Sequence, residues 1–124
     1  MGGIETQNEL IALLQRAGNP ADYAARATIF EAGAPAASMY VVVSGTVAIE
    51  HDGQVIEEVG PSGLFGEMAL IDAHPRSATA IAQTDVRLVS IEARRFWFLV
   101  QETPYFAQLV MRVMAQRLRR ADTA

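Results

Sequence analysis

The sequence predicts a mainly β protein with flanking helices, in which an antiparallel β-roll (jelly-roll-like, or double-stranded β-helix) follows an N-terminal helix and precedes two C-terminal helices. Between residues 23 and 92, short apolar segments alternate with Gly, Pro, Asp and Asn at near-regular spacing, as in antiparallel sandwiches and barrels. Helical periodicity is present before and after this region. No internal repeat or low-complexity linker divides the chain, so residues 1–124 are expected to form one domain.

The first expected element is a helix over about residues 5–17. Its apolar residues lie near helical spacing: Ile4, Leu10, Ile11, Leu13 and Leu14. Thr6 or Asn8 is placed to cap the start, and the sequence Gly18-Asn19-Pro20 is expected to end the helix. The β-roll is therefore expected to start at about residue 23.

Within the predicted β-roll, turn-forming residues divide the chain into short strands. The strand-like segments are, in order, "ATIFEAG", "SMYVVVSGTVAIEHDG", "QVIEEVGPSG", "SATAIAQ" and "DVRLVSIEA". The turns are expected at Ser44-Gly45, His51-Asp52-Gly53, Gly60-Pro61 and Thr84-Asp85. The second segment is therefore read as two strands joined by a turn, and the last two segments as a pair.

Helical periodicity returns near the C-terminus, where two helices are expected over about residues 93–121. Pro104 suits the first turn of the final helix, and Thr103 can cap it. Six residues of that helix form an apolar stripe at helical spacing: Phe106, Leu109, Val110, Val113, Met114 and Leu118. Because such a seam supports two-fold pairing, a homodimer through this helix is one interpretation.

The composition argues against several classes of function. The net charge of −4 argues against general binding to nucleic acid, which requires a basic face. The sequence contains no cysteine, so disulfides and thiolate chemistry are excluded. Its start lacks the pattern of a secretory signal, and no apolar run is long enough for a transmembrane helix. A cytoplasmic protein without a membrane partner is expected.

The stretch "FGEMALIDAHPRSATA", residues 65–80, contains the residues best suited to bind a ligand. A glycine opens a short run of helix formers, and a helix start exposes N–H groups that favour an anion such as phosphate. Gly66 allows close approach to the backbone, and Arg76 offers a fork of donors that matches phosphate oxygens. Ser77 adds a hydroxyl, and Glu67 can accept a hydrogen bond from a sugar hydroxyl. The pattern indicates a pocket for a phosphate joined to a ribose.

An alternative interpretation is that Glu67 and Arg76 form an ion pair that closes a loop. Exposed ion pairs are common and contribute about 0–1 kcal/mol to stability. The two interpretations are compatible, because such a pair could hold Glu67 while the pocket is empty.

The same stretch resembles the phosphate-binding cassette of the cyclic nucleotide-binding domains, which occur in catabolite activator-type regulators, cyclic-nucleotide-dependent kinases and gated channels. Those cassettes read Phe-Gly-Glu, a short apolar helix, a few loop residues, then Arg-Ser or Arg-Thr and Ala, and "FGEMALIDAHPRSATAIA" follows that order. The segments "TIFEAG", "SMYVVVSGTVAI", "VGPSGLFGE" and "DVRLVSIEARRF" also resemble the family's strands and turns in the expected order. The similarity covers roughly residues 23–120.

Carried over by position, the resemblance implies that the ligand is cAMP or cGMP. Glu67 would accept a hydrogen bond from the ribose 2′-hydroxyl, and Arg76 would bind the cyclic phosphate. Ser77 and the N–H groups near Gly66, Met68 and Ala69 would complete the phosphate site. Ser at this position is common among bacterial cAMP binders, so the resemblance favours cAMP over cGMP.

The resemblance also implies contacts to the base. Three apolar residues would form a wall against the purine while also packing in the strand core: Ile49, Ile56 and Val59. In this family the last helix moves over the base, and Arg119 or Arg120 is the candidate contact from that helix. The sequence departs from the family pattern at Arg26-Ala27, where many relatives have Gly-Glu before the second strand.

The favoured interpretation is a regulatory module that is not an enzyme, uses no cofactor or metal, and shifts its C-terminal helices when a cyclic nucleotide binds. The alternatives are a fragment of a transcription regulator that lacks its DNA-binding domain, and an interaction or dimerisation domain with an unused pocket. A metal-dependent cupin enzyme is disfavoured, because His51 lies in a turn and His74 in the cassette loop rather than clustered on a strand. A sensor of this size would act through its own dimer, through an effector protein that the sequence does not specify, or through a further domain outside this sequence.

Overall fold

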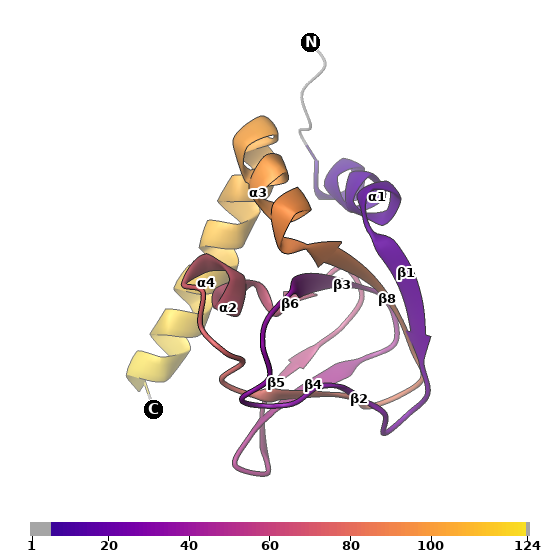
Figure 1. Ribbon diagram of the computed structural model, residues 1–124, viewed down its shortest axis with the longest axis vertical. Helices are drawn as coiled ribbons and strands as arrows, with labels where there is room; N and C mark the ends of the chain where they lie inside the picture. Colours follow the sequence, from indigo (N-terminus) through magenta and orange to yellow (C-terminus); the bar gives the residue numbers. More distant parts are fainter. Residues whose placement is uncertain (1–5, 124) are drawn as a thin grey trace.

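Figure 1 shows a computed structural model in which helices pack against a β-roll made of two sheets. The structure describes residues 6–123. The elements in chain order are α1 (Gln7–Ala17), β1 (Asn19–Tyr23), β2 (Thr28–Phe30), β3 (Ser38–Ser44), β4 (Val47–His51), β5 (Gln54–Val59), β6 (Leu64–Phe65), α2 (Glu67–Ile71), β7 (Thr79–Ala82), β8 (Val86–Glu92), α3 (Ala93–Glu102) and α4 (Pro104–Thr123). The predicted fold class, a β-roll with one N-terminal and two C-terminal helices, is confirmed.

Helix α1 begins after Thr6, one of the two caps that the sequence suggested. The Thr6 hydroxyl accepts a hydrogen bond from the Glu9 N–H at 3.1 Å, and the Glu9 carboxylate accepts one from the Thr6 N–H at 3.1 Å. This capping box satisfies two backbone donors at the helix start. The helix ends at Ala17, as expected; the predicted start at residue 5 and the apolar Ile4 lie outside the described residues.

The expectation that the β-roll starts near residue 23 is wrong, because β1 follows α1 almost directly. β1 pairs antiparallel with β8, from Asn19 opposite Ser90 to Tyr23 opposite Val86. Pro20 argues against a strand at this position, because proline has no backbone N–H to donate. β1 is the edge strand of its sheet, however, where a missing N–H is tolerated. Pairing with a distant strand therefore overrides the local signal.

Both sheets are antiparallel, with strand orders β1-β8-β3-β6 and β2-β7-β4-β5. The predicted turn between β3 and β4 contains Gly45 with a positive φ of 85°. The turn between β4 and β5 has positive φ at Asp52 (52°) and Gly53 (79°), which suits a two-residue hairpin loop. The expected breaks after Val59 and before Val86 also coincide with strand ends.

The core has two parts. The first packs helices α1, α3 and α4 against β3 and β8, and its fully buried members are Leu10, Leu14, Met39, Val41, Ile91, Phe96 and Phe106. The second lies inside the β-roll and includes Val42, Val47, Phe65 and Leu88. Each fully buried large apolar side chain contributes about 1.5–3 kcal/mol relative to an exposed one, so both parts stabilise the arrangement of strands around the cassette.

The two C-terminal helices meet at Thr103, whose N–H donates to the Leu99 carbonyl and closes α3. Most of the predicted stripe on α4 packs within the chain: Phe106 and Val110 are buried, and Leu109, Val113 and Met114 pack partly buried against the same core. Leu118 differs, because 58% of its surface is exposed. None of the helices in residues 6–123 is both long and apolar enough to span a bilayer.

Candidate functional site

The cassette crosses from one sheet to the other. It starts in β6, which pairs with β3, turns at Gly66 into the short helix α2, and continues into β7 of the second sheet. Gly66 has φ +83°, and a Cβ atom there would lie 2.9 Å from Nη1 of Arg76. Glycine therefore avoids strain in the left-handed backbone and allows the close approach of the arginine.

Arg76 is buried, with 5% of its surface exposed. Its Nη1 donates to the Gly66 carbonyl at 2.7 Å, and its Nη2 donates to the Ser38 carbonyl. The guanidinium carbon lies 4.0 Å from the centroid of the Phe30 ring. Burial lowers the pKa of Arg76 from its ordinary value, which reflects the cost of removing the charge from water.

Arg76 retains unused binding capacity for an anion. A guanidinium has five N–H donors, and protein acceptors take up two of those of Arg76. The Nε atom is buried with no partner, and within residues 6–123 no carboxylate lies at ion-pair distance from this side chain. A buried cation of this kind is best satisfied by an anion with several acceptor oxygens, such as phosphate.

Glu67, at the start of α2, is fully buried but does not pair with Arg76. Its Oε2 accepts a hydrogen bond from Nη1 of Arg117 at 2.6 Å. Its Oε1 is buried and has no partner among the described residues. The alternative in which Glu67 and Arg76 close a loop as an ion pair is therefore wrong, and Oε1 of Glu67 is available to accept a hydrogen bond from a hydroxyl group.

Arg117 of α4 joins the last helix to the cassette. Its Nε and Nη2 donate to the two carboxylate oxygens of Glu57 at 2.9 Å each, and its Nη2 also donates to the Leu64 carbonyl at 2.8 Å. Its side chain is 14% exposed and that of Glu57 is 19% exposed. Burial alone would lower the pKa of Arg117, but hydrogen bonds and charge from Glu57 and Glu67 outweigh burial and raise it.

Neither Arg117 nor Glu57 is among the site residues predicted from the sequence. The arginines predicted to contact the ligand from α4 are Arg119 and Arg120. Arg119 is exposed, whereas Nη1 of Arg120 lies 3.2 Å from Oε1 of Glu57. The only local signal was that α4 is rich in arginine, and choosing among its arginines requires knowing which side of the helix faces the cassette.

The remaining predicted phosphate contacts lie near Arg76 in the chain and differ in exposure. Met68 is 39% exposed, Ala69 is half-buried and Ser77 is exposed. The Ser77 carbonyl lies 3.3 Å from Nδ1 of His51, which connects the cassette to the end of β4.

The three residues of the predicted base wall have different environments. Val59 is buried in the core inside the β-roll, and Ile49 is half-buried against that core. Ile56 is 52% exposed and lies at a bulge, where Ile49 pairs with Glu57 and Glu50 pairs with Val55. Their contact with a base stays a prediction.

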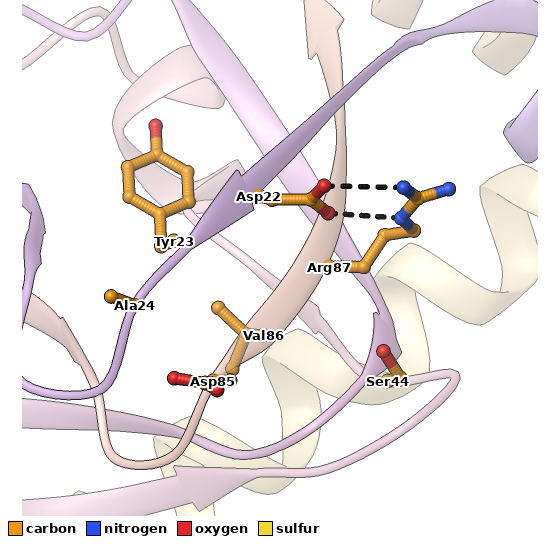
Figure 2. Close-up of a pocket in the computed structure, with 7 residues that line it drawn as sticks. All are labelled: Asp22, Tyr23, Ala24, Ser44, Asp85, Val86 and Arg87. Carbon is orange, nitrogen blue, oxygen red and sulfur yellow. Dashed lines mark hydrogen bonds and ion pairs between the residues drawn. The ribbon is translucent and has the colours of Figure 1, made fainter.

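Figure 2 shows a separate surface depression of about 390 Å³. It is lined by Asp22, Tyr23, Ala24, Ser44, Asp85, Val86 and Arg87. Its main polar feature is the two-bond pair in which Arg87 donates to Asp22, and both side chains are more than half exposed. These charges satisfy each other in solvent, so the candidate site is the cassette and not this depression. No group of three or more potential metal ligands occurs in the part of the chain that the structure describes.

Comparison with known proteins gives independent evidence of the family to which the chain belongs. The family described as "Cyclic nucleotide-binding domain" matches residues 20–103. A CRP-like cAMP-activated global transcriptional regulator of Mycobacterium tuberculosis is 35% identical over 119 residues, which cover 90% of this chain and 52% of the regulator. The chain thus spans about half the length of this curated relative.

Solved structures show the same likeness in three dimensions. The catabolite activator protein of Thermus thermophilus matches with a TM-score of 0.82 and 32% identity, over 93% of this chain and 56% of that one. A structure titled "A cyclic-GMP-dependent signalling pathway regulates bacterial phytopathogenesis" matches with a TM-score of 0.77 and 31% identity, over 94% of this chain and 96% of that one. The fold, the cassette geometry and these matches agree: the chain belongs to the cyclic nucleotide-binding domain family.

Proposed function

We propose that this chain is a non-enzymatic sensor that binds a cyclic nucleotide in the cassette. One observation carries the proposal: among residues 6–123, a buried guanidinium without a carboxylate partner lies in the same cassette as a buried carboxylate with one unpartnered oxygen. A cyclic nucleotide supplies both missing groups, because its phosphate accepts from Arg76 and its ribose hydroxyl donates to Oε1 of Glu67. Ser77 and the N–H groups near Gly66 complete the phosphate contacts.

Ligand binding in the cassette would be transmitted to the rest of the protein through helix α4. Arg117 holds one oxygen of Glu67 while the ribose would take the other, so ligand binding acts directly on the contact between the cassette and the last helix. A ligand shifts a conformational equilibrium only as far as its contacts differ between the two states. Repacking of α3 and α4 on binding is therefore proposed to begin at the Glu67–Arg117 contact.

cAMP is the favoured ligand, on the basis of Ser77. Similar proteins point to both nucleotides: the Mycobacterium tuberculosis regulator is described as cAMP-activated, whereas one solved structure is titled for a cyclic-GMP-dependent pathway. Both nucleotides therefore belong in the binding test.

The test is calorimetric titration of wild-type protein with cAMP and with cGMP, next to Arg76→Lys and Arg87→Lys. Lysine keeps the charge but loses the planar fork of donors, so Arg76→Lys is expected to weaken binding by about tenfold or more. Arg87→Lys changes the depression of Figure 2 and should bind like wild type. Absence of binding by wild-type protein, or an unaffected Arg76→Lys, would overturn the proposal.

A second candidate is a dimerisation or regulator module that works as part of a longer protein. Met111 and Leu118 of α4 are 62% and 58% exposed and lie two helical turns apart, so they share a face that a second copy could cover. The match to about half of a transcriptional regulator supports the fragment version of this candidate. A stable dimer that binds neither nucleotide would favour it over the sensor. Cytoplasmic localisation and action through an effector protein stay predictions.

A further inference from the structure

Phe30 lies where the backbone of β2 is irregular. Thr28 pairs with Ile81, but Phe30 pairs with Ala80, so β2 contains one extra residue relative to β7. Bulges of this kind redirect side chains and are common beside functional sites. The last side chain of β2 is placed against the guanidinium of Arg76, with 4.0 Å between the guanidinium carbon and the ring centroid.

Two other aromatic rings hold the Phe30 ring in place. Its centroid lies 6.0 Å from those of Tyr40 and of Phe65, and the planes are tilted by 31° and 36°. Tyr40 and Phe65 are direct cross-strand partners in β3 and β6, and their rings stack at 5.1 Å. The cluster packs against the core inside the β-roll, so the orientation of Phe30 is determined by buried neighbours.

The backbone of Arg76 is also tied to the segment that follows Phe30. The Gly33 N–H donates to the Arg76 carbonyl at 2.7 Å, and the Arg76 N–H donates to the Ala34 carbonyl at 2.9 Å. The side chain and the main chain of Arg76 are thus positioned by β2 and its following loop. The Phe30 ring contacts the guanidinium carbon, whereas the buried Nε has no hydrogen-bond partner among residues 6–123 and can still donate to a ligand.

We propose that Phe30 is a positioning residue for the phosphate site: its ring face holds the Arg76 guanidinium in the plane from which the remaining N–H groups bind the ligand's phosphate. The inference rests on the proposed function and extends it to a residue that makes no ligand contact itself. A cation over an aromatic face is stabilised by the ring quadrupole, which replaces part of the hydration that a buried guanidinium loses. An aliphatic side chain fills the space but lacks this attraction.

The first test is the affinity for cAMP, or for cGMP if that nucleotide binds more tightly. Phe30→Leu is expected to weaken binding by roughly threefold to thirtyfold, the range that a cation–π contact supports, whereas Phe30→Tyr keeps a ring and should stay close to wild type. Phe98→Leu is the matched control, because Phe98 is 52% exposed on α3 and 6.0 Å from a different arginine, Arg95. Thermal unfolding without ligand verifies folding, and Phe30→Met replaces Phe30→Leu if the latter does not fold.

A double-mutant cycle separates positioning from general packing. If Phe30 acts through Arg76, Phe30→Leu should change the affinity by less than about twofold in an Arg76→Gln background, because the shared interaction is already gone. Arg76→Lys serves as the background if Arg76→Gln binds too weakly to titrate. Equal losses in both backgrounds would show a merely structural role and overturn the inference.

A measurement without nucleotide distinguishes failure of the inference from failure of the proposed function. Guanidinium protons above an aromatic face experience a ring-current shift in the NMR spectrum. The chemical shift of the Arg76 Nε–H proton should therefore change in Phe30→Leu and stay close to the wild-type value in Phe30→Tyr. If wild-type protein binds nucleotide but this resonance and the affinity are both unchanged in Phe30→Leu, the inference is wrong. If wild-type protein binds neither nucleotide, the proposed function fails, and with it the role of Phe30 at a phosphate site.

Discussion

Arg76 and Glu67 are buried charged residues that each keep one polar atom without a partner in the described part of the chain, residues 6–123. Such atoms are rare in folded proteins, because a buried donor or acceptor without a hydrogen bond costs about 1–3 kcal/mol. Their occurrence in one short cassette, with opposite charge and opposite hydrogen-bonding character, is the residue-scale argument for a ligand that both donates and accepts. Gly66 completes the arrangement, because its carbonyl accepts a hydrogen bond from Arg76 and its lack of a Cβ atom leaves space for the guanidinium.

At this scale, Gly66→Ala is expected to lower both stability and nucleotide affinity. The left-handed backbone costs a non-glycine residue about 1–2 kcal/mol, and the new Cβ atom would also displace the Arg76 guanidinium. Gly53→Ala is the control, because Gly53 has a similar φ of 79° and, apart from its chain neighbours, no described residue comes within 4 Å of the added Cβ. The midpoint temperature of thermal unfolding should fall in both variants, whereas the affinity for cAMP should fall only in Gly66→Ala. Equal losses of affinity in the two variants would contradict this explanation.

Glu67→Gln tests the ribose contact separately from the phosphate contact. Loss of a charged acceptor should weaken cAMP binding by roughly tenfold to a hundredfold. The loss should be much smaller for 2′-deoxy-cAMP, which has no hydroxyl to donate. Calorimetry with the two nucleotides measures the difference, and a similar loss for both would place Glu67 away from the ribose.

At the scale of elements, helix α4 is attached to the β-roll through charge as well as through apolar packing. Figure 1 shows α4 running past α2, and Arg117 makes the connection to Glu67 there and to Glu57 of β5. Burial raises the pKa of Glu57, but hydrogen bonds and charge from Arg117 and charge from Arg120 outweigh it, so its pKa lies below the ordinary 4.5. The ionised form of Glu57 therefore stabilises the docked helix.

The contribution of Glu57 should depend on pH with a definite sign. Because its pKa is lowered by folding, its stabilisation is present above the ordinary value of 4.5 and is lost as the pH falls through the lowered value. Glu57→Gln should reduce the free energy of unfolding by about 1.5–3 kcal/mol at pH 7, and the difference from wild type should shrink toward pH 3. Urea unfolding at several pH values measures this.

The matched control for that experiment is Glu58→Gln on the same strand. Glu58 is exposed and accepts a hydrogen bond from Gln83 instead of from α4. Its substitution should have a small effect at every pH, and hydrogen exchange in α4 should accelerate only in Glu57→Gln. Unchanged exchange in Glu57→Gln would show that the pair does not hold the helix.

At the scale of the whole molecule, apolar residues are exposed on α4 although most of its predicted stripe is used inside the chain. Val110 and Phe106 belong to the core, so they are not available to a second copy, whereas Met111 and Leu118 are more than half exposed. If the protein forms a dimer, these two residues are the expected contact. The stripe inferred from sequence periodicity thus combines residues that pack in the core with one residue, Leu118, that is exposed on the surface.

Leu118→Glu is expected to convert a dimer into a monomer, because a charge would be buried in an apolar helix seam. Arg119→Glu is the control, since it adds a negative charge at an exposed neighbouring position of the same helix. Light scattering after size-exclusion chromatography, with and without cAMP, measures the mass. A wild-type monomer under both conditions, or equal dissociation by both variants, would contradict this surface.

Much of the fold could be predicted because its signals are local. Periodicity located α1, α3 and α4, and glycine and aspartate located the hairpin turns at Gly45 and Gly53. β1 was missed because its evidence is pairing with β8, which no local pattern contains. The partner of Glu67 was missed for the same reason, since Arg117 is 50 residues away in the chain.

The sequence by itself determined the type of site: the order of residues in the cassette places a glycine, a carboxylate and a guanidinium on one short, locally encoded segment. Only the tertiary structure decided how these groups are used. Folding buries Arg76 against Phe30 and the Ser38 carbonyl, and directs Arg117 instead of Arg119 toward Glu67. The physical reason is that burial and ion pairing depend on which surfaces meet when α4 and β2 pack around the cassette, and that information is distributed over the whole chain.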